Sequence, residues 1–194
     1  MDTNETPASP ASDRRLVLIG LTAAAALASL AGGADAASRG EINANADAAM
    51  SHLFEFSPRA RDLADHARGV LIFPHIVKAG FIFGGAGGEG VLRIGGRSVA
   101  YFSLGAASFG FQAGVKEYSL AMFFMTRSAL DFLRNSQGWA LGGGPEIVVI
   151  DQGMAAGLNT TSLSQPVYAM VFHQRGLEGG ISLSGSKITH IHPD

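Results

Sequence analysis

The chain has 194 residues, of which 47% are hydrophobic, 15% are charged and 26 are glycine. This length predicts one domain, or one domain with a processed segment, and the low charged fraction excludes a disordered polyelectrolyte. A net charge of −2 gives no uniform basic field that would attract nucleic acid. Because the chain contains no cysteine, disulfides, thiolate nucleophiles and cysteine-ligated metals are excluded.

Residues 1–36 have the pattern of an export signal. Arg14-Arg15 precede the apolar run from Leu16 to Leu30, and Ala34-Asp35-Ala36 supplies a small-residue cleavage site. These three features together predict a signal that is cleaved after Ala36. The segment from Arg14 to Leu18 resembles a twin-arginine signal, with a general secretory signal as the alternative. We expect an exported protein that resides in the periplasm, peripheral on an envelope membrane.

Residues 37–194 are expected to form a single domain. Removing residues 1–36 takes away two of the 14 basic and four of the 16 acidic residues, so the remainder is formally neutral. Only three of the 26 glycines leave with the signal, so the excess of glycine persists. Any binding driven by charge must therefore come from a local patch.

The first part of this domain is predicted to be helical. From Ser38 to Ala67 apolar residues recur at intervals of three or four, at Ile42, Ala46, Ala49, Leu53 and Phe56. Ser57-Pro58 is typical of a helix start, so a second short helix should run to about His66. Thr126 is expected to cap a third helix, from Arg127 to about Ser136, with Gly138 ending it.

The rest of the domain is rich in short β-type runs separated by glycine. About ten strands are predicted, at Val70–Phe73, Phe81–Phe83, Val91–Ile94, Val99–Leu104, Phe109–Val115, Tyr118–Phe124, Glu146–Ile150, Val167–His173, Leu177–Leu183 and Lys187–Ile191. Their close spacing favours antiparallel pairing. The predicted fold class is α+β, a mainly antiparallel, strongly curved or barrel-like β-sheet with two N-terminal helices and one further helix packed on it.

The glycine-rich segment from Gly84 to Gly90 contains a formal G-x-G-x-x-G match. A dinucleotide site would require this match to open a helix. A strand and a Gly-Gly turn follow instead, so no nucleotide or other cofactor is expected. We predict that these glycines form turns and bulges, or let two backbones pass closely where the sheet curls.

Two further patterns are weak evidence for a catalytic or metal site. Ser184 to Lys187 matches the S-x-x-K of serine acyl-transfer enzymes, but its β-rich surroundings favour a hairpin turn. His190 and His192 would share one face of a strand, but no firm third ligand accompanies them. We predict no catalytic residue and no metal site; an enzyme whose site is assembled from distant residues is the alternative.

Basic residues gather in sequence around the second helix and the first strand. They lie beside very apolar segments, and they are Arg59, Arg61, Arg68 and Lys78, followed by Arg93 and Arg97 at the next turn. A basic cluster next to exposed apolar side chains is typical of a surface that docks onto anionic lipid. The alternative is that these residues are solvated or paired with Asp62, Asp65 or Glu89.

Three ordered motifs resemble one known family. Residues Ala67 to Phe81, followed by Gly84, Gly88 and Gly90, are similar to the opening of the SYLF domain. The segment from Ser108 to Gly114 resembles its G-x-Q-x-G strand, and the segment from Gly176 to Ser186 resembles its closing run. The resemblance spans roughly Ile42 to Ile191.

This resemblance implies a lipid-binding module without catalytic activity or cofactor. The family is associated with acidic phospholipids, and phosphoinositides are the ligands of its eukaryotic members. The actin-binding segments of those members are absent, so actin bundling is not expected. Among the family's motif positions in this chain, only Lys78 can offer a positive charge to a headgroup.

The sequence therefore predicts non-catalytic binding of anionic phospholipid, with phosphoinositide-like headgroups, at a bacterial envelope membrane. The headgroup contacts are expected from Lys78 and the five arginines, while an apolar helix face or strand edge inserts shallowly. No nucleic acid or nucleotide partner is expected, and protein partners stay undefined. The alternatives are a periplasmic structural or protein-interaction protein and a hydrolase.

Overall fold

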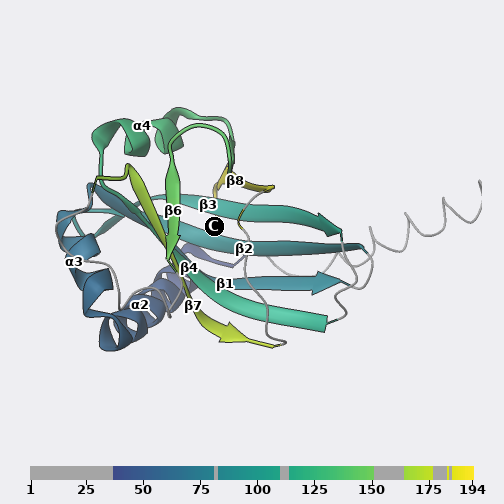
Figure 1. The fold of residues 1–194 in the computed structure, drawn as a ribbon. Coiled ribbons are helices and arrows are strands. Elements are labelled where there is room, and N and C mark those ends of the chain that lie inside the picture. Colours follow the sequence, from purple (N-terminus) through teal and green to yellow (C-terminus); the bar gives the residue numbers. More distant parts are fainter. Residues whose placement is uncertain (1–36, 81–82, 110–113, 151–163, 177–182, 184) are drawn as a thin grey trace, which may run out of the picture. The chain divides into compact units, whose positions relative to one another are not determined.

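The computed structural model describes residues 37–80, 83–109, 114–150, 164–176, 183 and 185–194. These residues form three helices and one eight-stranded sheet (Figure 1). The helices are α2 (Arg39–Phe56), α3 (Pro58–His66) and α4 (Arg127–Asn135). The strands are β1 (Gly69–Gly80), β2 (Phe83–Ile94), β3 (Arg97–Phe109), β4 (Gly114–Phe124), β5 (Trp139–Ala140), β6 (Ile147–Ile150), β7 (Val167–Arg175) and β8 (Ser186–Ile191).

All of these elements lie in residues 37–194, which form one compact unit. The predicted export signal and most of the predicted strand Leu177–Leu183 lie outside the described residues. Within the described part of the chain, no helix is long and apolar enough to cross a membrane.

Side-chain caps set the helix starts, as the sequence predicted. The Ser57 hydroxyl accepts a hydrogen bond from the Ala60 N–H at 3.2 Å, and Pro58 occupies the first turn of α3. The Thr126 hydroxyl accepts one from the Ala129 N–H at 3.3 Å at the start of α4. The predicted boundaries of all three helices are confirmed to within one or two residues.

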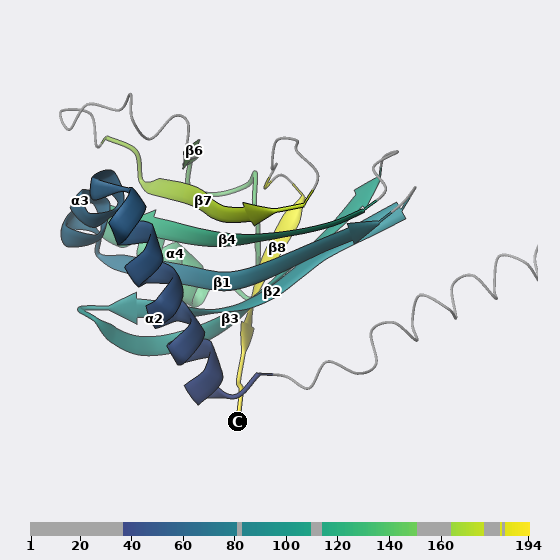
Figure 2. The ribbon, with the colours of Figure 1, turned by 90° about the horizontal axis from the view of Figure 1, so that it is seen from below.

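The sheet has the strand order β5-β8-β3-β2-β1-β4-β7-β6. Strands β6 and β7 run parallel, whereas the other described pairs are antiparallel. The predicted α+β class with a curled, mainly antiparallel sheet is confirmed. Figure 2 shows α2 crossing one face of the sheet obliquely.

Each face of the sheet has its own hydrophobic cluster, because successive residues of a strand point to opposite faces. On β1, Leu71 and Phe73 belong to the cluster that includes α4 and Trp139. Ile72, between them, belongs to the cluster formed with α2 and α3. The central strands are therefore apolar on both faces where helices cover them, as in β4, where every residue from Tyr118 to Phe124 is buried.

The N-terminal end of α2 is bonded to the last residues of the described chain. The Arg39 backbone N–H donates to the Asp194 carbonyl oxygen at 3.0 Å. Its side-chain Nε donates to the Pro193 carbonyl oxygen at 2.8 Å. These contacts join the two ends of the domain beside β3 and β8.

A bulge in β1 marks the bend of the sheet. The pairing of β1 with β4 shifts between Phe73 and Ile76, so Pro74 and His75 oppose the region of Ser119. Pro74 has no N–H for the ladder, and the buried Ser119 hydroxyl donates to the Pro74 carbonyl oxygen at 2.6 Å. This side-chain bond satisfies an acceptor that the bulge removes from regular pairing.

Glycine on the neighbouring strand lets the bulge approach closely. A Cβ atom on Gly88 would overlap the His75 carbonyl oxygen, and one on Gly90 would lie 2.6 Å from Phe73 Cδ1. The predicted close passage of backbones is thus confirmed at two positions. Positive φ angles occur elsewhere, for instance at Gly95 (57°) and Gly96 (77°), which form the β2–β3 turn.

Turns were the other role predicted for the glycines from Gly84 to Gly90, and this prediction is wrong, because these residues lie within β2. The prediction of about ten short strands is also wrong in detail. Continuous strands run through the glycines of β2 and through Lys116 and Glu117 of β4. Glycine lacks a side chain to pack, but its backbone can still pair in a strand, so these glycines do not interrupt β2.

We expect Gly90→Ala to lower the free energy of unfolding by about 1–3 kcal/mol, because the new methyl group overpacks the β1 bulge. Gly105→Ala on β3 is the matched control, since a Cβ atom there meets nothing within 4 Å. Denaturant unfolding of both variants tests this expectation. Equal stability of the two variants would contradict it.

Candidate functional site

The six predicted basic residues occupy two ends of the sheet and do not form one cluster. Arg59 and Arg61 lie on α3, and Arg68 lies just before β1. Arg93 and Arg97 flank the β2–β3 turn at this same end, since Arg93 pairs with Val70. Lys78 lies eight residues along β1 from Val70, a distance of about 25 Å at the rise of a strand.

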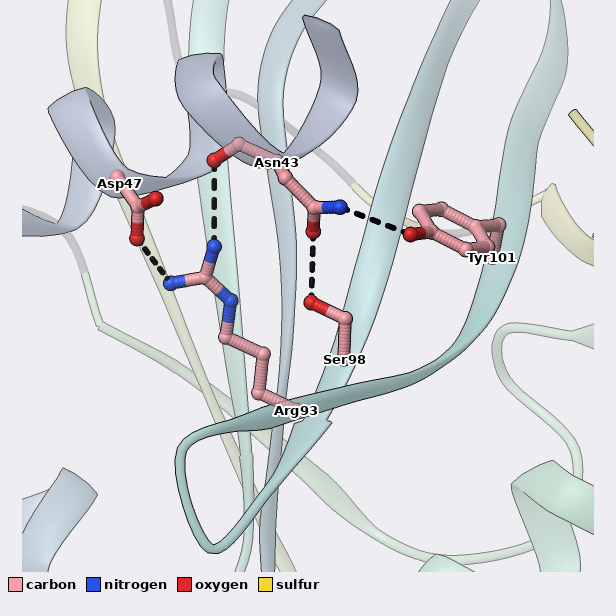
Figure 3. Close-up of polar contacts among 5 residues, drawn as sticks. All are labelled: Asn43, Asp47, Arg93, Ser98 and Tyr101. Carbon is pink, nitrogen blue, oxygen red and sulfur yellow. Dashed lines mark hydrogen bonds and ion pairs between the residues drawn. The ribbon is translucent and has the colours of Figure 1, made fainter. Parts of the chain in front are cut away.

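Arg93 is part of a polar network between α2 and the β2–β3 hairpin (Figure 3). One guanidinium nitrogen lies 2.6 Å from the Asp47 carboxylate, and another donates to the Asn43 carbonyl oxygen at 3.2 Å. The Asn43 amide extends the network to Ser98 and Tyr101, at 2.6 and 2.8 Å. Arg93 therefore holds the helix onto the hairpin, and we do not include it among lipid contacts.

Arg59 is also engaged within the domain. Its side chain is only 10% exposed, and its guanidinium lies 3.9 Å from the Asp62 carboxylate. Glu89, another predicted partner for the arginines, accepts a hydrogen bond from the Ala37 N–H at 3.0 Å.

The remaining arginines at this end are exposed. The Arg61 guanidinium lies over the Phe54 ring, 4.8 Å from its centroid. Phe56, at the end of α2, is 64% exposed. Arg68 and Arg97 are likewise exposed, and the acidic residues Asp62 and Asp65 of α3 lie close to Arg68 in sequence. This end of the sheet therefore carries charges of both signs.

The other end of the sheet has a different composition. Lys78 on β1 lies directly opposite Lys116 on β4. Among the described residues, none of the ion pairs includes either lysine. Like charges directly opposite one another on paired strands repel, so this pair favours an anionic ligand.

Exposed apolar side chains lie at the same end, on the opposite face of the same strands. Val77 is 46% exposed and Val115 is 63% exposed, and Ala79 pairs with Val115. Figure 1 shows the ends of β1 to β4 extending beyond the helices. We call the group Val77, Lys78, Ala79, Val115 and Lys116 the lysine end of the sheet.

Tyr118 lies on β4 between the lysine end and the hydrophobic core. It lies two residues from Lys116 on the same face and is 3% exposed. Burial raises the pKa of the Tyr118 phenol, so this group stays neutral and leaves the lysine charges uncompensated.

Sequence reasoning missed Lys116 because it placed a break between the predicted strands Phe109–Val115 and Tyr118–Phe124. In the structure, β4 runs without interruption from Gly114 to Phe124. The alternation of Val115, Glu117 and Ser119 with Lys116, Tyr118 and Leu120 was the available signal. Pairing this segment with β1 would then have placed Lys116 beside Lys78.

The weaker sequence motifs do not form sites in the described structure. The formal dinucleotide match lies inside β2 and opens no helix. Ser184, the serine of the S-x-x-K match, lies outside the described residues, and Lys187 belongs to β8. His190 stacks on Phe102 with centroids 4.2 Å apart. Within the described residues, no group of three His, Asp or Glu side chains is arranged to hold a metal ion.

Within the described residues, one end of the curled sheet carries two lysines that form no ion pair, together with exposed valines. The family model Ysc84, described as Las17-binding protein actin regulator, matches residues 105–192. This is the SYLF domain family, and these residues belong to it. The family consists of binding domains known for lipid binding and actin regulation and is not a known enzyme family. No curated protein matches the chain.

The match covers the end of β3 and everything from β4 to β8. It therefore includes Val115 and Lys116 of the lysine end. Lys78 lies in the part of the chain whose likeness to the family rests on the motif from Ala67 to Phe81.

We expect Arg93→Ala to lower the free energy of unfolding by about 1–2 kcal/mol, because it removes two charge-assisted hydrogen bonds and the packing of the side chain. Asp47→Ala should cost less than about 1 kcal/mol, since Asp47 is 67% exposed. Thermal unfolding of the two single variants and the double variant measures the coupling. Additive effects would show that the ion pair contributes nothing.

Proposed function

We propose that the domain binds anionic phospholipid surfaces through the lysine end of the sheet. The observation that carries this proposal is the direct opposition of Lys78 and Lys116 without an acidic partner among the described residues. The membership of residues 105–192 in a family known for lipid binding supports it.

The alternation of side chains supports docking by the end of the sheet. Val77, Ala79 and Val115 project from one face, and the two lysines project from the other. Strand ends that enter the headgroup layer would bury the small apolar side chains. The long lysine stems would let both ammonium groups stay among the phosphates.

The expected affinity is modest and sensitive to salt. Each lysine near an anionic surface contributes about 1 kcal/mol, so the pair favours anionic over neutral lipid by roughly 30-fold. Screening reduces this preference as the ionic strength rises. Stable association would then require several such contacts or a second attachment.

The proposed ligand is an anionic phospholipid with a phosphoinositide-like headgroup, on the surface of a bacterial envelope membrane. The proposed location rests on the export-signal pattern of residues 1–36. The domain acts by binding, and no chemical step is assigned to it.

The arginines at the other end are a second, weaker candidate contact. Arg61 lies over the Phe54 ring, and Phe56, two residues further along at the end of α2, is exposed and could insert into the headgroup layer. Because about 25 Å of strand separates them from Lys78, the two ends would not act as one compact headgroup site.

We expect Lys78→Glu and Lys116→Glu each to weaken binding to anionic vesicles at least about tenfold, because each reverses one of two charges at the lysine end. Co-sedimentation of residues 37–194 with phosphatidylcholine vesicles, with and without phosphatidylglycerol, measures this. Omitting residues 1–36 removes the apolar run of the signal pattern, which would itself bind lipid.

The matched control is Arg127→Glu, which makes the same change of charge at the exposed start of α4. This variant should bind as the unaltered protein does. Arg61→Glu tests the opposite end of the sheet. A loss of vesicle binding larger than that of the lysine variants would assign the lipid contact to that end. Equally little binding to neutral and anionic vesicles would refute lipid binding altogether.

A further inference from the structure

Three histidines from three elements meet beside the lysine end. His75 of β1 has its Nδ1 atom 3.1 Å from the Glu117 carboxylate of β4. The rings of His52 of α2 and His173 of β7 are in contact, with centroids 3.8 Å apart and planes tilted by 34°. Arg175 of β7 lies directly opposite Glu117. We call His52, His75 and His173 the histidine group.

Two bulges bring these side chains together. The bulge of β1 contains His75, and the pairing of β7 with β4 also shifts, between Glu117 and Ser119. His173 lies at this second shift with φ 55°, and it is the one non-glycine residue with positive φ in the described chain. Non-glycine residues seldom adopt this conformation, and Asn and His are among those that do. A positive φ at a bulge redirects a side chain, here toward α2.

The histidine group adjoins the lysine end in the sheet. Glu117 follows Lys116 on β4 and lies opposite Val77 of β1. His75 precedes Lys78 by three residues on the same strand. The imidazoles lie on the face of Val77 and Val115, opposite the lysines, so a charge gained by them would add to the positive charge of the same strand ends.

The charged groups on the elements around the histidine group carry both signs. On the face that carries the histidine group, β4 contributes Glu117 and β7 contributes Arg175, whereas Lys78 and Lys116 project from the opposite face of the same strand ends. On α2, Glu55 follows His52 by three residues, and α3, on the same face, carries Arg59 next to Asp62. Glu117 is thus the acidic group in direct contact with a member of the histidine group.

These surroundings hold His173 neutral near neutral pH. Burial, and then the positive charge of His52, Arg175 and His75, lower the pKa of His173 from its ordinary value of 6.5, while Glu117 opposes them. An anionic surface close by would supply the counter-charge that the protein lacks. Protonation and binding to such a surface should then favour each other, by thermodynamic reciprocity.

We propose that proton uptake by the histidine group strengthens the binding of the lysine end to an anionic phospholipid surface, so that membrane association rises as the pH falls. This inference rests on the proposed function. It adds a pH-dependent regulation of the same site, which acts between about pH 7.5 and pH 5.5, where histidines change charge.

The test compares binding to phosphatidylglycerol-containing vesicles at about pH 7.5 and about pH 5.5, on the two sides of the ordinary histidine pKa. It uses the same protein of residues 37–194, which keeps every described element and both hydrophobic clusters. We expect binding about tenfold tighter at the lower pH. Neutral vesicles should show no such gain.

The triple variant His52→Gln, His75→Gln, His173→Asn should lose this gain and keep the binding seen at the higher pH. Asparagine suits position 173 because it tolerates positive φ. His192→Asn, at an exposed position beyond β8, is the matched control and should keep the full pH dependence. If the triple variant does not fold, His75→Gln alone serves, because this ring is 60% exposed, and it should lose part of the gain.

NMR titration of the imidazoles provides a readout that is independent of sedimentation. The pKa of His173 should lie below its ordinary value in free protein and rise when anionic vesicles are added. Equal binding to anionic vesicles at both pH values would overturn this inference and leave the proposed function intact. A control variant that loses the gain as the triple variant does would also overturn it. No binding at either pH would instead refute the proposed function.

Discussion

The close passage of β2 over the bulge of β1 is the constraint on which the rest of the structure depends. Gly88 and Gly90 leave no room for even a methyl group beside the backbone of β1. This contact lets the sheet bend at Pro74, and the hydroxyl of Ser119 satisfies the carbonyl oxygen that the bend releases. Beyond the bend, the strands continue past the helices, which is where the lysine end lies. The close approach of β1 and β2 in the middle of the sheet thus explains part of the excess of glycine in the composition.

The same bend separates two kinds of surface. On the helix side of the bulge, both faces of β1 and β4 are buried in the two hydrophobic clusters. On the other side, the strands carry alternating valine and lysine, which are exposed or partly exposed. The folded core thus supports strand ends whose valines and lysines are not buried in it. Such an end is suited to contact with a surface whose outer layer is charged and whose interior is apolar, as a phospholipid bilayer is.

Local signals in the sequence predicted the helices well and the site only partly. Ser57-Pro58 and Thr126 act on the backbone groups next to them, so their effect is readable from a few residues. The break predicted before Tyr118 was wrong because β4 gains its pairing from β1 and β7, which are distant in sequence. Lys116 and the histidine group depend on that pairing and on two bulges. The register of paired strands, which no short motif encodes, decides which charges meet.

The bonds from Arg39 to Asp194 and Pro193 also bear on the order of folding. They join the first helix of the domain to residues that are separated from it by more than 150 positions. During synthesis, α2 can complete this contact only after residue 194 has been made. Contacts of such long range close slowly, because the chain must first lose the entropy of a large loop. Until then, the N-terminal end of α2 lacks these two bonds, whereas the rest of the helix can already pack on β1 and β2, which follow it in sequence.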